Sequence, residues 1–250
     1  MIYGLYESAA GMLTNEYRQT VLANNIANAD TVGFKRDVAT FAERVPAWQA
    51  GQRRGPSAVD LQNLSGGMWL GGTFTDYSEG PKIRTDNPYD VALDGPGFLV
   101  VAADGQRLYT RDGRMMKAAD GQLVAASDGA PVLGRGGVPI RLNPYGGEPS
   151  IDTQGRISQD GAIVGELELA DFQDYGALRK VGAARFAGPD DRVVPAPVLV
   201  QSGYIENSGV QPLAELVSLM EASHAYQLNA RMVSLQDDAA GKLINVLLRA

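Results

Sequence analysis

The sequence predicts an α+β fold in which an N-terminal and a C-terminal helix pair as a coiled-coil-like α-helical domain, with a central, mostly antiparallel β domain between them in the chain. Apolar residues recur every three or four positions near both ends. Between the ends, Asp-Gly dipeptides separate short apolar runs. We expect residues 1–40 and 204–250 to form the terminal helical domain, residues 41–75 an extended linker or loop, and residues 76–203 the β-rich domain.

The N-terminal helix is predicted by an apolar stripe that lies on one helical face. Its members are Tyr6, Ala9, Leu13, Tyr17 and Val21. The pattern weakens where asparagines compete with the backbone for hydrogen bonds, and Gly33 provides a stop.

The C-terminal helix is predicted by a longer stripe with the same spacing. Its members are Leu213, Val217, Met220, His224, Leu228, Met232, Leu235, Ala239, Leu243 and Val246. Pro212 suits the first helical turn. A helix of this length, about 50 Å at 1.5 Å per residue, needs a partner along its length, and the N-terminal helix is the candidate.

The central β domain is predicted by hairpin turns. Asp-Gly pairs begin at six positions, which are Asp94, Asp104, Asp112, Asp120, Asp128 and Asp160. Glycine accepts the positive φ of tight primed turns, so these pairs between apolar runs such as Phe98–Val101 indicate a β-meander. Residues 41–75 contain several glycines and no sustained period, which predicts the linker.

Composition excludes several classes of function. The net charge is -7 without a run of Lys or Arg, so nucleic acid is not an expected partner. The chain has no cysteine and one histidine, which removes disulfides, cysteine-based metal sites and a Ser-His-Asp triad. No stretch reaches the roughly 20 apolar residues of a membrane span, and residues 1–13 do not resemble a signal peptide.

The remaining motifs favour structure over catalysis. The Asp-Gly series lacks the nine-residue, two-glycine repeat of a calcium-binding β-roll. Gly66–Gly72 lacks the Lys-Ser or Lys-Thr of a phosphate loop, and Glu166 and Glu168 are expected on a solvated strand face. We therefore expect no enzyme activity, no cofactor, no metal and no catalytic residue.

Four segments then resemble one family in the same order along the chain. Residues 23–35 (ANNIANADTVGFK) are similar to the N-terminal signature of the flagellar rod, hook and hook-associated axial proteins. Residues 87–98, residues 109–113 and the block from Tyr204 to Asn229 resemble later family segments, although the family usually has Asn where this chain has Gly209. The chain is too short for the extra outer domains of hook proteins, which leaves the rod proteins.

The resemblance implies a structural subunit of the bacterial flagellar basal-body rod, located in the periplasmic part of the basal body. It implies polymerisation with copies of itself and with other rod proteins, export by the flagellar type III apparatus without a cleaved signal peptide, and no direct membrane insertion. The approach from Asp76 to Asn87 and residues 198–203 are more similar to the proximal rod subunit. Tyr204 and Tyr226 are more similar to the distal rod subunit, which is the alternative.

The expected assembly interface follows the signature and the two helical stripes. Its members are Leu13, Tyr17, Asn24, Asn25, Ile26, Asn28, Gly33, Phe34, Val210, Leu216, Val217, Met220, Tyr226, Leu228, Asn229, Met232 and Leu235. In this hypothesis the asparagine amides bond to adjacent subunits, Gly33 makes a turn and Phe34 anchors it. The rival class is a soluble β-domain binding module dimerised by its helices, and a β-rich hydrolase has the least support.

Overall fold

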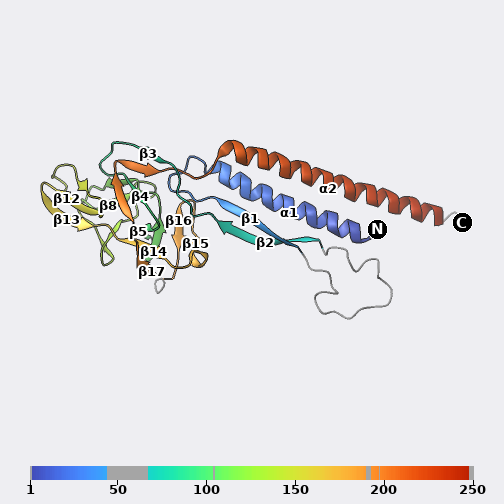
Figure 1. The fold of residues 1–250 in the computed structure, drawn as a ribbon, viewed down its shortest axis with the longest axis horizontal. Helices are drawn as coiled ribbons and strands as arrows, with labels where there is room; N and C mark the ends of the chain where they lie inside the picture. The colour runs from blue at the N-terminus through green and yellow to red at the C-terminus, as the bar shows by residue number, and fades with distance from the viewer. Residues whose placement is uncertain (1, 44–66, 104, 190–192, 197, 248–250) are drawn as a thin grey trace. The chain divides into compact units, whose positions relative to one another are not determined.

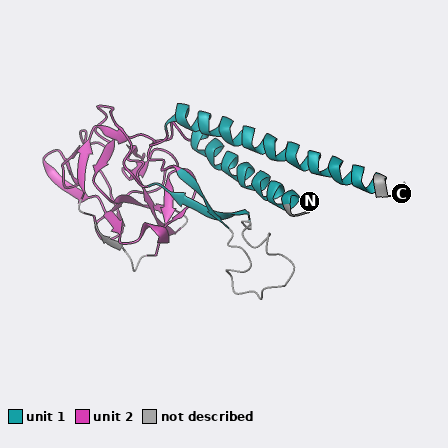
Figure 2. Ribbon diagram, turned by 45° about the vertical axis from the view of Figure 1, so that its right-hand side comes forward, with its two compact units in different colours: residues 1–27, 37–76, 211–250 teal, residues 28–36, 77–210 magenta. Residues whose placement is uncertain are grey.

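A computed structural model describes residues 2–43, 67–103, 105–189, 193–196 and 198–247. The chain divides into two compact units, shown in separate colours in Figure 2. The α unit comprises residues 1–27, 37–76 and 211–250, and the β unit comprises residues 28–36 and 77–210. The chain therefore passes between the units four times, and the segment 28–36 belongs to the β unit although both of its neighbours in sequence belong to the α unit.

The α unit contains the two predicted helices, α1 (Ile2–Ala27) and α2 (Pro212–Leu247). They lie side by side and run in opposite directions (Figure 1). Pro212 is the first residue of α2, as predicted, because proline lacks the N–H that a first helical turn leaves unpaired. The chain is thus α+β with helices at both ends, as the sequence indicated.

A β-hairpin completes the α unit. Strands β1 (Asp37–Glu43) and β2 (Met68–Thr75) pair antiparallel, with a register shift between Thr40 and Phe41 that leaves Gly71 as the extra residue of a bulge. The sequence analysis expected a linker over 41–75, but both ends of that range are strand. The bulge and its adjacent glycines break the two-residue period by which a strand is detected. Residues 44–66 lie outside the described residues.

The β unit is built from short strands, and every strand pair named in its described part is antiparallel. The central six-stranded sheet has the order β15-β16-β6-β5-β14-β17. Its strands are β5 (Phe98–Ala103), β6 (Gln106–Thr110), β14 (Leu169–Phe172), β15 (Arg179–Lys180), β16 (Arg185–Ala187) and β17 (Val193–Pro195).

Smaller sheets complete the unit (Figure 1). The pair β3 and β19 comprises Lys82–Arg84 and Tyr204–Glu206, and the pair β4 and β18 comprises Val91–Asp94 and Leu199–Ser202. The others are β7 (Met115–Lys117) with β8 (Leu123–Ala125), β9 (Leu133–Gly134) with β10 (Val138–Pro139), and β11 (Ser150–Ile151) with β12 (Arg156–Gln159) and β13 (Ala162–Glu166). A short 3-10 helix, η2, spans Tyr175–Ala177.

The predicted turns account for part of this topology. Asp160 and Gly161 join β12 to β13 and have φ of 52° and 82°, which a type I′ hairpin turn requires at both central residues. Strands β5 and β6 also form a hairpin, at the Asp104-Gly105 pair, of which Asp104 lies outside the described residues. Asp112-Gly113 is different: it joins no strand pair, and Gly113 instead accepts a backbone hydrogen bond from Val91.

The β unit has its own apolar core. A cluster of aliphatic side chains, among them Val91, Leu99 and Ile157, is almost completely buried. A second cluster packs the rings of Phe98, Tyr109, Phe172 and Phe186, with edge-to-face or tilted ring pairs. The apolar core of the unit is therefore formed by side chains of its own.

Among the described helices, neither combines the length and the hydropathy that crossing a lipid bilayer would require.

Candidate assembly interface

The α unit buries polar side chains between its helices and exposes apolar ones. Among the helical side chains that the structure describes, six are buried and two of these are apolar; the six are Ser8, Thr14, Val21, Asn25, Glu215 and Ala222. The predicted C-terminal stripe lies on the opposite side, since Met220 is 55% exposed, Leu228 61% and Leu235 61%. The sequence analysis expected the helices to pair through their apolar stripes. In the structure they do not.

Seven apolar members of the expected interface are left exposed by this arrangement. They are Leu13, Leu216, Val217, Met220, Leu228, Met232 and Leu235. Leu5, Tyr6, Leu213, Leu243 and Ile244 are exposed in the same way and extend this surface. We call these twelve residues the apolar stripe.

The β1–β2 hairpin adds exposed apolar side chains that sequence reasoning did not assign to the interface. Val38 and Phe74 face each other across the hairpin and are 38% and 60% exposed, and Trp69 is 61% exposed. Tyr17, an expected interface residue, contacts the hairpin through a 2.5 Å hydrogen bond between its hydroxyl and that of Thr73. The alternation of β1 and β2 could have revealed this surface if the bulge had been recognised.

Asn25 is engaged inside the chain. It is 1% exposed, its side-chain Nδ2 donates to the carbonyl of Asp37 at 2.8 Å, and its Oδ1 accepts from the Asp37 N–H at 2.9 Å. These two hydrogen bonds attach the start of β1 to α1. The amide is therefore engaged within the chain, because its nitrogen also donates to the Glu215 carboxylate at 3.5 Å.

The other asparagines and half-buried residues of the expected interface have mixed positions. Asn28 accepts a hydrogen bond from the Thr31 hydroxyl at 3.2 Å, and Asn24 is exposed and has a further interaction within the chain. Ile26, Tyr226 and Asn229 are half-buried, while Val210 is buried at 7% exposure.

Gly33 and Phe34 lie inside the β unit. Gly33 has a φ of 70° and donates its N–H to the Glu206 carbonyl at 2.8 Å, and a Cβ at this position would come within 2.3 Å of the Asp112 backbone nitrogen. Phe34 is 1% exposed, with the Lys180 ammonium 4.1 Å from its ring centroid. Phe34 therefore packs against its own chain.

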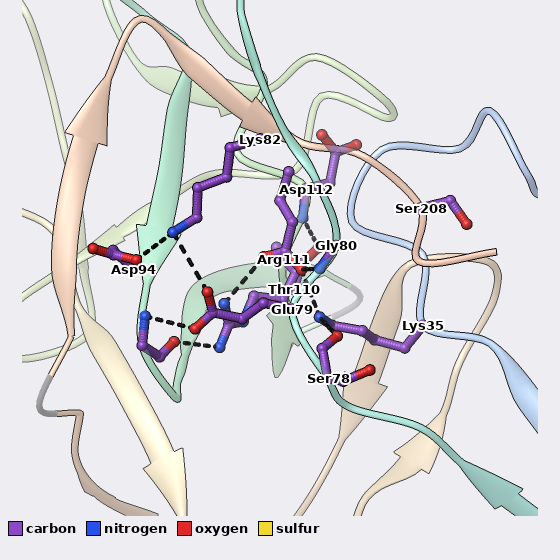
Figure 3. Close-up of polar contacts among 12 residues, drawn as sticks. Lys35, Ser78, Glu79, Gly80, Lys82, Asp94, Thr110, Arg111, Asp112 and Ser208 are labelled. Carbon is purple, nitrogen blue, oxygen red and sulfur yellow. Dashed lines mark hydrogen bonds and ion pairs between the residues drawn. The ribbon is translucent and has the colours of Figure 1, made fainter. Parts of the chain in front are cut away.

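A buried ion cluster fixes the same segment (Figure 3). The Glu206 carboxylate accepts hydrogen bonds from the Lys35 ammonium at 2.5 Å, from Arg111 at 3.0 Å and from the Gly80 N–H at 3.0 Å. The three charged side chains are at most 3% exposed. We call Lys35, Arg111 and Glu206 the ion cluster.

Backbone carbonyls also accept hydrogen bonds from both cations. Lys35 donates to the Ser78 carbonyl at 2.7 Å and Arg111 to the Gly95 carbonyl at 2.7 Å. Burial lowers the pKa of the Lys35 ammonium below its ordinary value, although the Glu206 carboxylate opposes that shift. The cations therefore depend on Glu206 for compensation of their charge.

The position of the ion cluster along the chain explains what it can do. Lys35 and Ser78 lie close to points where the chain passes between the units, and Glu206 lies shortly before the passage into α2. The cluster ties these segments together inside the β unit. Sequence reasoning missed it, although one of its charged residues lies in each of three segments that carried the family resemblance.

The arrangement anchors and packs segments of the chain. The ion cluster is buried, and its charged groups pair with one another inside the β unit. In the part of the chain that the structure describes, no three His, Cys, Asp or Glu side chains are grouped so that they could hold a metal ion. The fold and surface define a class of protein with a self-sufficient β unit and an α unit that presents apolar side chains outward.

Comparisons with known proteins give the family. Three family models match in order: "Flagella basal body rod protein" over residues 5–35, "Flagellar hook protein FlgE/F/G D1 domain" over 92–163, and "Flagellar basal body rod FlgEFG protein C-terminal" over 201–246. The FlgG rod protein of Buchnera aphidicola subsp. Schizaphis graminum is 31% identical, with 97% of this chain and 99% of the relative covered.

Two Caulobacter vibrioides proteins are similar to the same degree. Its FlgF rod protein is 32% identical over 92% of this chain and 91% of the relative, and its FlgG rod protein is 29% identical over 93% and 95%. The chain belongs to the flagellar basal-body rod protein family and is a structural rod subunit.

Proposed function

We propose that this chain polymerises through its terminal helices into the hollow shaft of the basal-body rod, with the β unit as the outer part of each subunit. The observation that carries the proposal is the apolar stripe, which a folded chain exposes along both helices. Burying one such Leu or Met side chain against a neighbour contributes about 1.5–3 kcal/mol. The twelve residues of the apolar stripe therefore favour association with neighbouring subunits, because the pairing of α1 with α2 leaves them exposed.

The pairing of α1 and α2 is coiled-coil-like in this proposal. Their antiparallel contact provides a two-helix element whose outer surface meets neighbouring subunits. A helical polymer needs head-to-tail contacts, so the stripe of α1 and the stripe of α2 contact different surfaces of successive subunits. These neighbours are copies of this chain and other rod proteins.

We further propose that the subunit belongs to the proximal rod and reaches it through the flagellar type III export apparatus. The sequence of residues 198–203 and the approach to Asn87 support the proximal position. The distal rod is the alternative, since the FlgF and FlgG relatives have comparable identities. Labelling of the chain in purified basal bodies distinguishes the two positions along the axle.

The test of assembly changes the stripe without changing the β unit. In a strain that lacks the native copy, the double variant Leu228→Asp and Leu235→Asp is expected to abolish swimming and to be absent from purified basal bodies. The control is Ser234→Asp, an exposed polar position on the same helix. Normal incorporation of the double variant would contradict the proposal, and a stable dimer in solution that never enters basal bodies would favour a soluble binding module.

A further inference from the structure

The contact between α1 and α2 is made at matched polar positions. Gln236 lies over Gly4, Asn229 lies over Gly11, and the buried Asn25 donates to the Glu215 carboxylate at 3.5 Å. Between the last two contacts, Gln19 donates to the Ala222 carbonyl at 3.3 Å. We call the three side-chain contacts Gly4 with Gln236, Gly11 with Asn229 and Asn25 with Glu215 the polar seam.

The spacing of the polar seam is that of a coiled-coil repeat. Gly4 and Gly11 are one heptad apart, and Asn25 follows two heptads later. On α2 the partners Gln236, Asn229 and Glu215 descend by the same steps, as an antiparallel pair requires. Polar residues at the contact positions of a coiled coil specify register at a cost in stability.

At both glycines an added Cβ would displace the amide that lies over it. A Cβ on Gly4 would come within 2.9 Å of Gln236 Nε2, and one on Gly11 within 2.9 Å of Asn229 Nδ2. The Asn229 amide is held in this position because it donates to the Ala225 carbonyl at 3.0 Å. By contrast, a Cβ on Gly241 of α2 would meet nothing within 4 Å. The helix backbones are therefore close where an amide of one helix packs on a glycine of the other.

We propose that the polar seam fixes which faces of α1 and α2 meet, which keeps the apolar stripe facing outward, and that it also fixes the register of the pair. A shift by one heptad would place Asn25 opposite Ala222 and leave the buried Glu215 carboxylate without this amide. Pairing through the apolar stripes would bury more apolar surface, but it would hide the surface that neighbours need. The seam thus selects one pairing against alternatives that hydrophobicity alone would favour.

The register itself is tested by disulfide trapping in the full-length chain, which has no native cysteine. Asn229 Cγ lies 3.1 Å from the position of a Cβ on residue 11, which brings the two β-carbons within the reach of a disulfide. The Gly11→Cys and Asn229→Cys pair is expected to close within one chain at least tenfold faster than two shifted pairs. These controls combine Gly11→Cys with Gln236→Cys, and Gly4→Cys with Asn229→Cys.

Trapping at equal rates in all three pairs, or none at the matched pair, would overturn the register. This experiment is independent of rod assembly. The consequence for the outward stripe rests on the proposed function and is tested separately by swimming.

The swimming test uses Gly11→Leu and the control Gly241→Leu. Gly11→Leu is expected to lower the swimming rate at least tenfold, and Gly241→Leu to change it less than twofold, because only the first intrudes on the seam. If trapping shows the register and Gly11→Leu still swims normally, the seam does not serve rod assembly. If neither trapping nor swimming separates matched from control variants, the inference fails altogether.

Discussion

The two units of this chain place their apolar and polar side chains in opposite ways. The β unit surrounds an apolar core and buries the ion cluster, whereas the α unit packs glycines and amides between its helices and exposes leucines and methionines. A core that is complete within the chain stabilises a domain by itself. An exposed apolar surface of this extent is typical of a site of association. The following predictions probe this difference, from the largest expected effect on the free chain to the smallest.

Removing the charge of Glu206 should cost most. Glu206→Gln leaves the buried Lys35 ammonium and Arg111 guanidinium facing each other without an anion, so the free energy of unfolding of the β unit should fall by about 3–5 kcal/mol. Denaturant unfolding followed by near-ultraviolet circular dichroism measures this change. The control Asp152→Asn breaks an exposed ion pair with Arg156 and should cost much less than the Glu206 change, because solvent screens that pair. Equal losses in both variants would show that the ion cluster is not special.

Truncating Phe34 separates folding from assembly. Because its ring is buried in the β unit, Phe34→Ala should lower the free energy of unfolding by about 3–5 kcal/mol, and rod incorporation should fall as a consequence. Tyr145→Ala, at a side chain that is 98% exposed, should stay within about 0.5 kcal/mol of the parent. An unchanged stability together with lost incorporation would instead make Phe34 a direct contact between subunits.

Tyr175 should make the free energy of unfolding of the β unit decrease at alkaline pH. Burial, with the 2.6 Å hydrogen bond from its hydroxyl to Asp171, raises the pKa of Tyr175 to about 12 from an ordinary value of 10.0. The unfolded chain then loses this proton first, so the contribution is fully present below pH 10 and decreases from pH 10 to 12. Tyr175→Phe should cost about 1 kcal/mol near neutral pH and show a smaller decrease across that interval. Identical pH profiles for the parent and the variant would refute the assignment.

Truncating the apolar stripe should hardly affect the free chain. Leu235 is 61% exposed, so Leu235→Ala should change the free energy of unfolding by no more than about 0.5 kcal/mol. The same change should lower the yield of rods, since the lost methyl groups face a neighbour only after assembly. A loss of 2 kcal/mol or more in the monomer would show that this side chain is covered within the chain. That result would contradict the difference between the two units.

The sequence predicted the elements better than their contacts. Both helices, the α+β class and the type I′ turn at Asp160 and Gly161 followed from periodicity and turn chemistry, because these signals are local. Periodicity also located the apolar stripe. It could not tell what covers the stripe, since a helix that packs on its own chain and one that packs on a neighbour have the same pattern.

The ion cluster and the hairpin show two further limits. Lys35 and Glu206 are separated by 171 residues, and nothing in one sequence pairs charges over that distance. Strand β2 was missed because a bulge at Gly71 interrupts its alternation. The glycines of the polar seam could not be identified from the sequence either. The role of a glycine in a helix is visible only when the side chain opposite it is known.

Hydrogen exchange, read by mass spectrometry on the free chain and on purified basal bodies, tests the contrast between the units most directly. In the free chain, we expect amides of α1 and α2 to exchange at least a hundredfold faster than those of strands such as β5, and assembly to protect the helices while leaving the β unit unchanged. Equal protection of helices and strands in the free chain would contradict the account, because the α unit would then be complete without its neighbours.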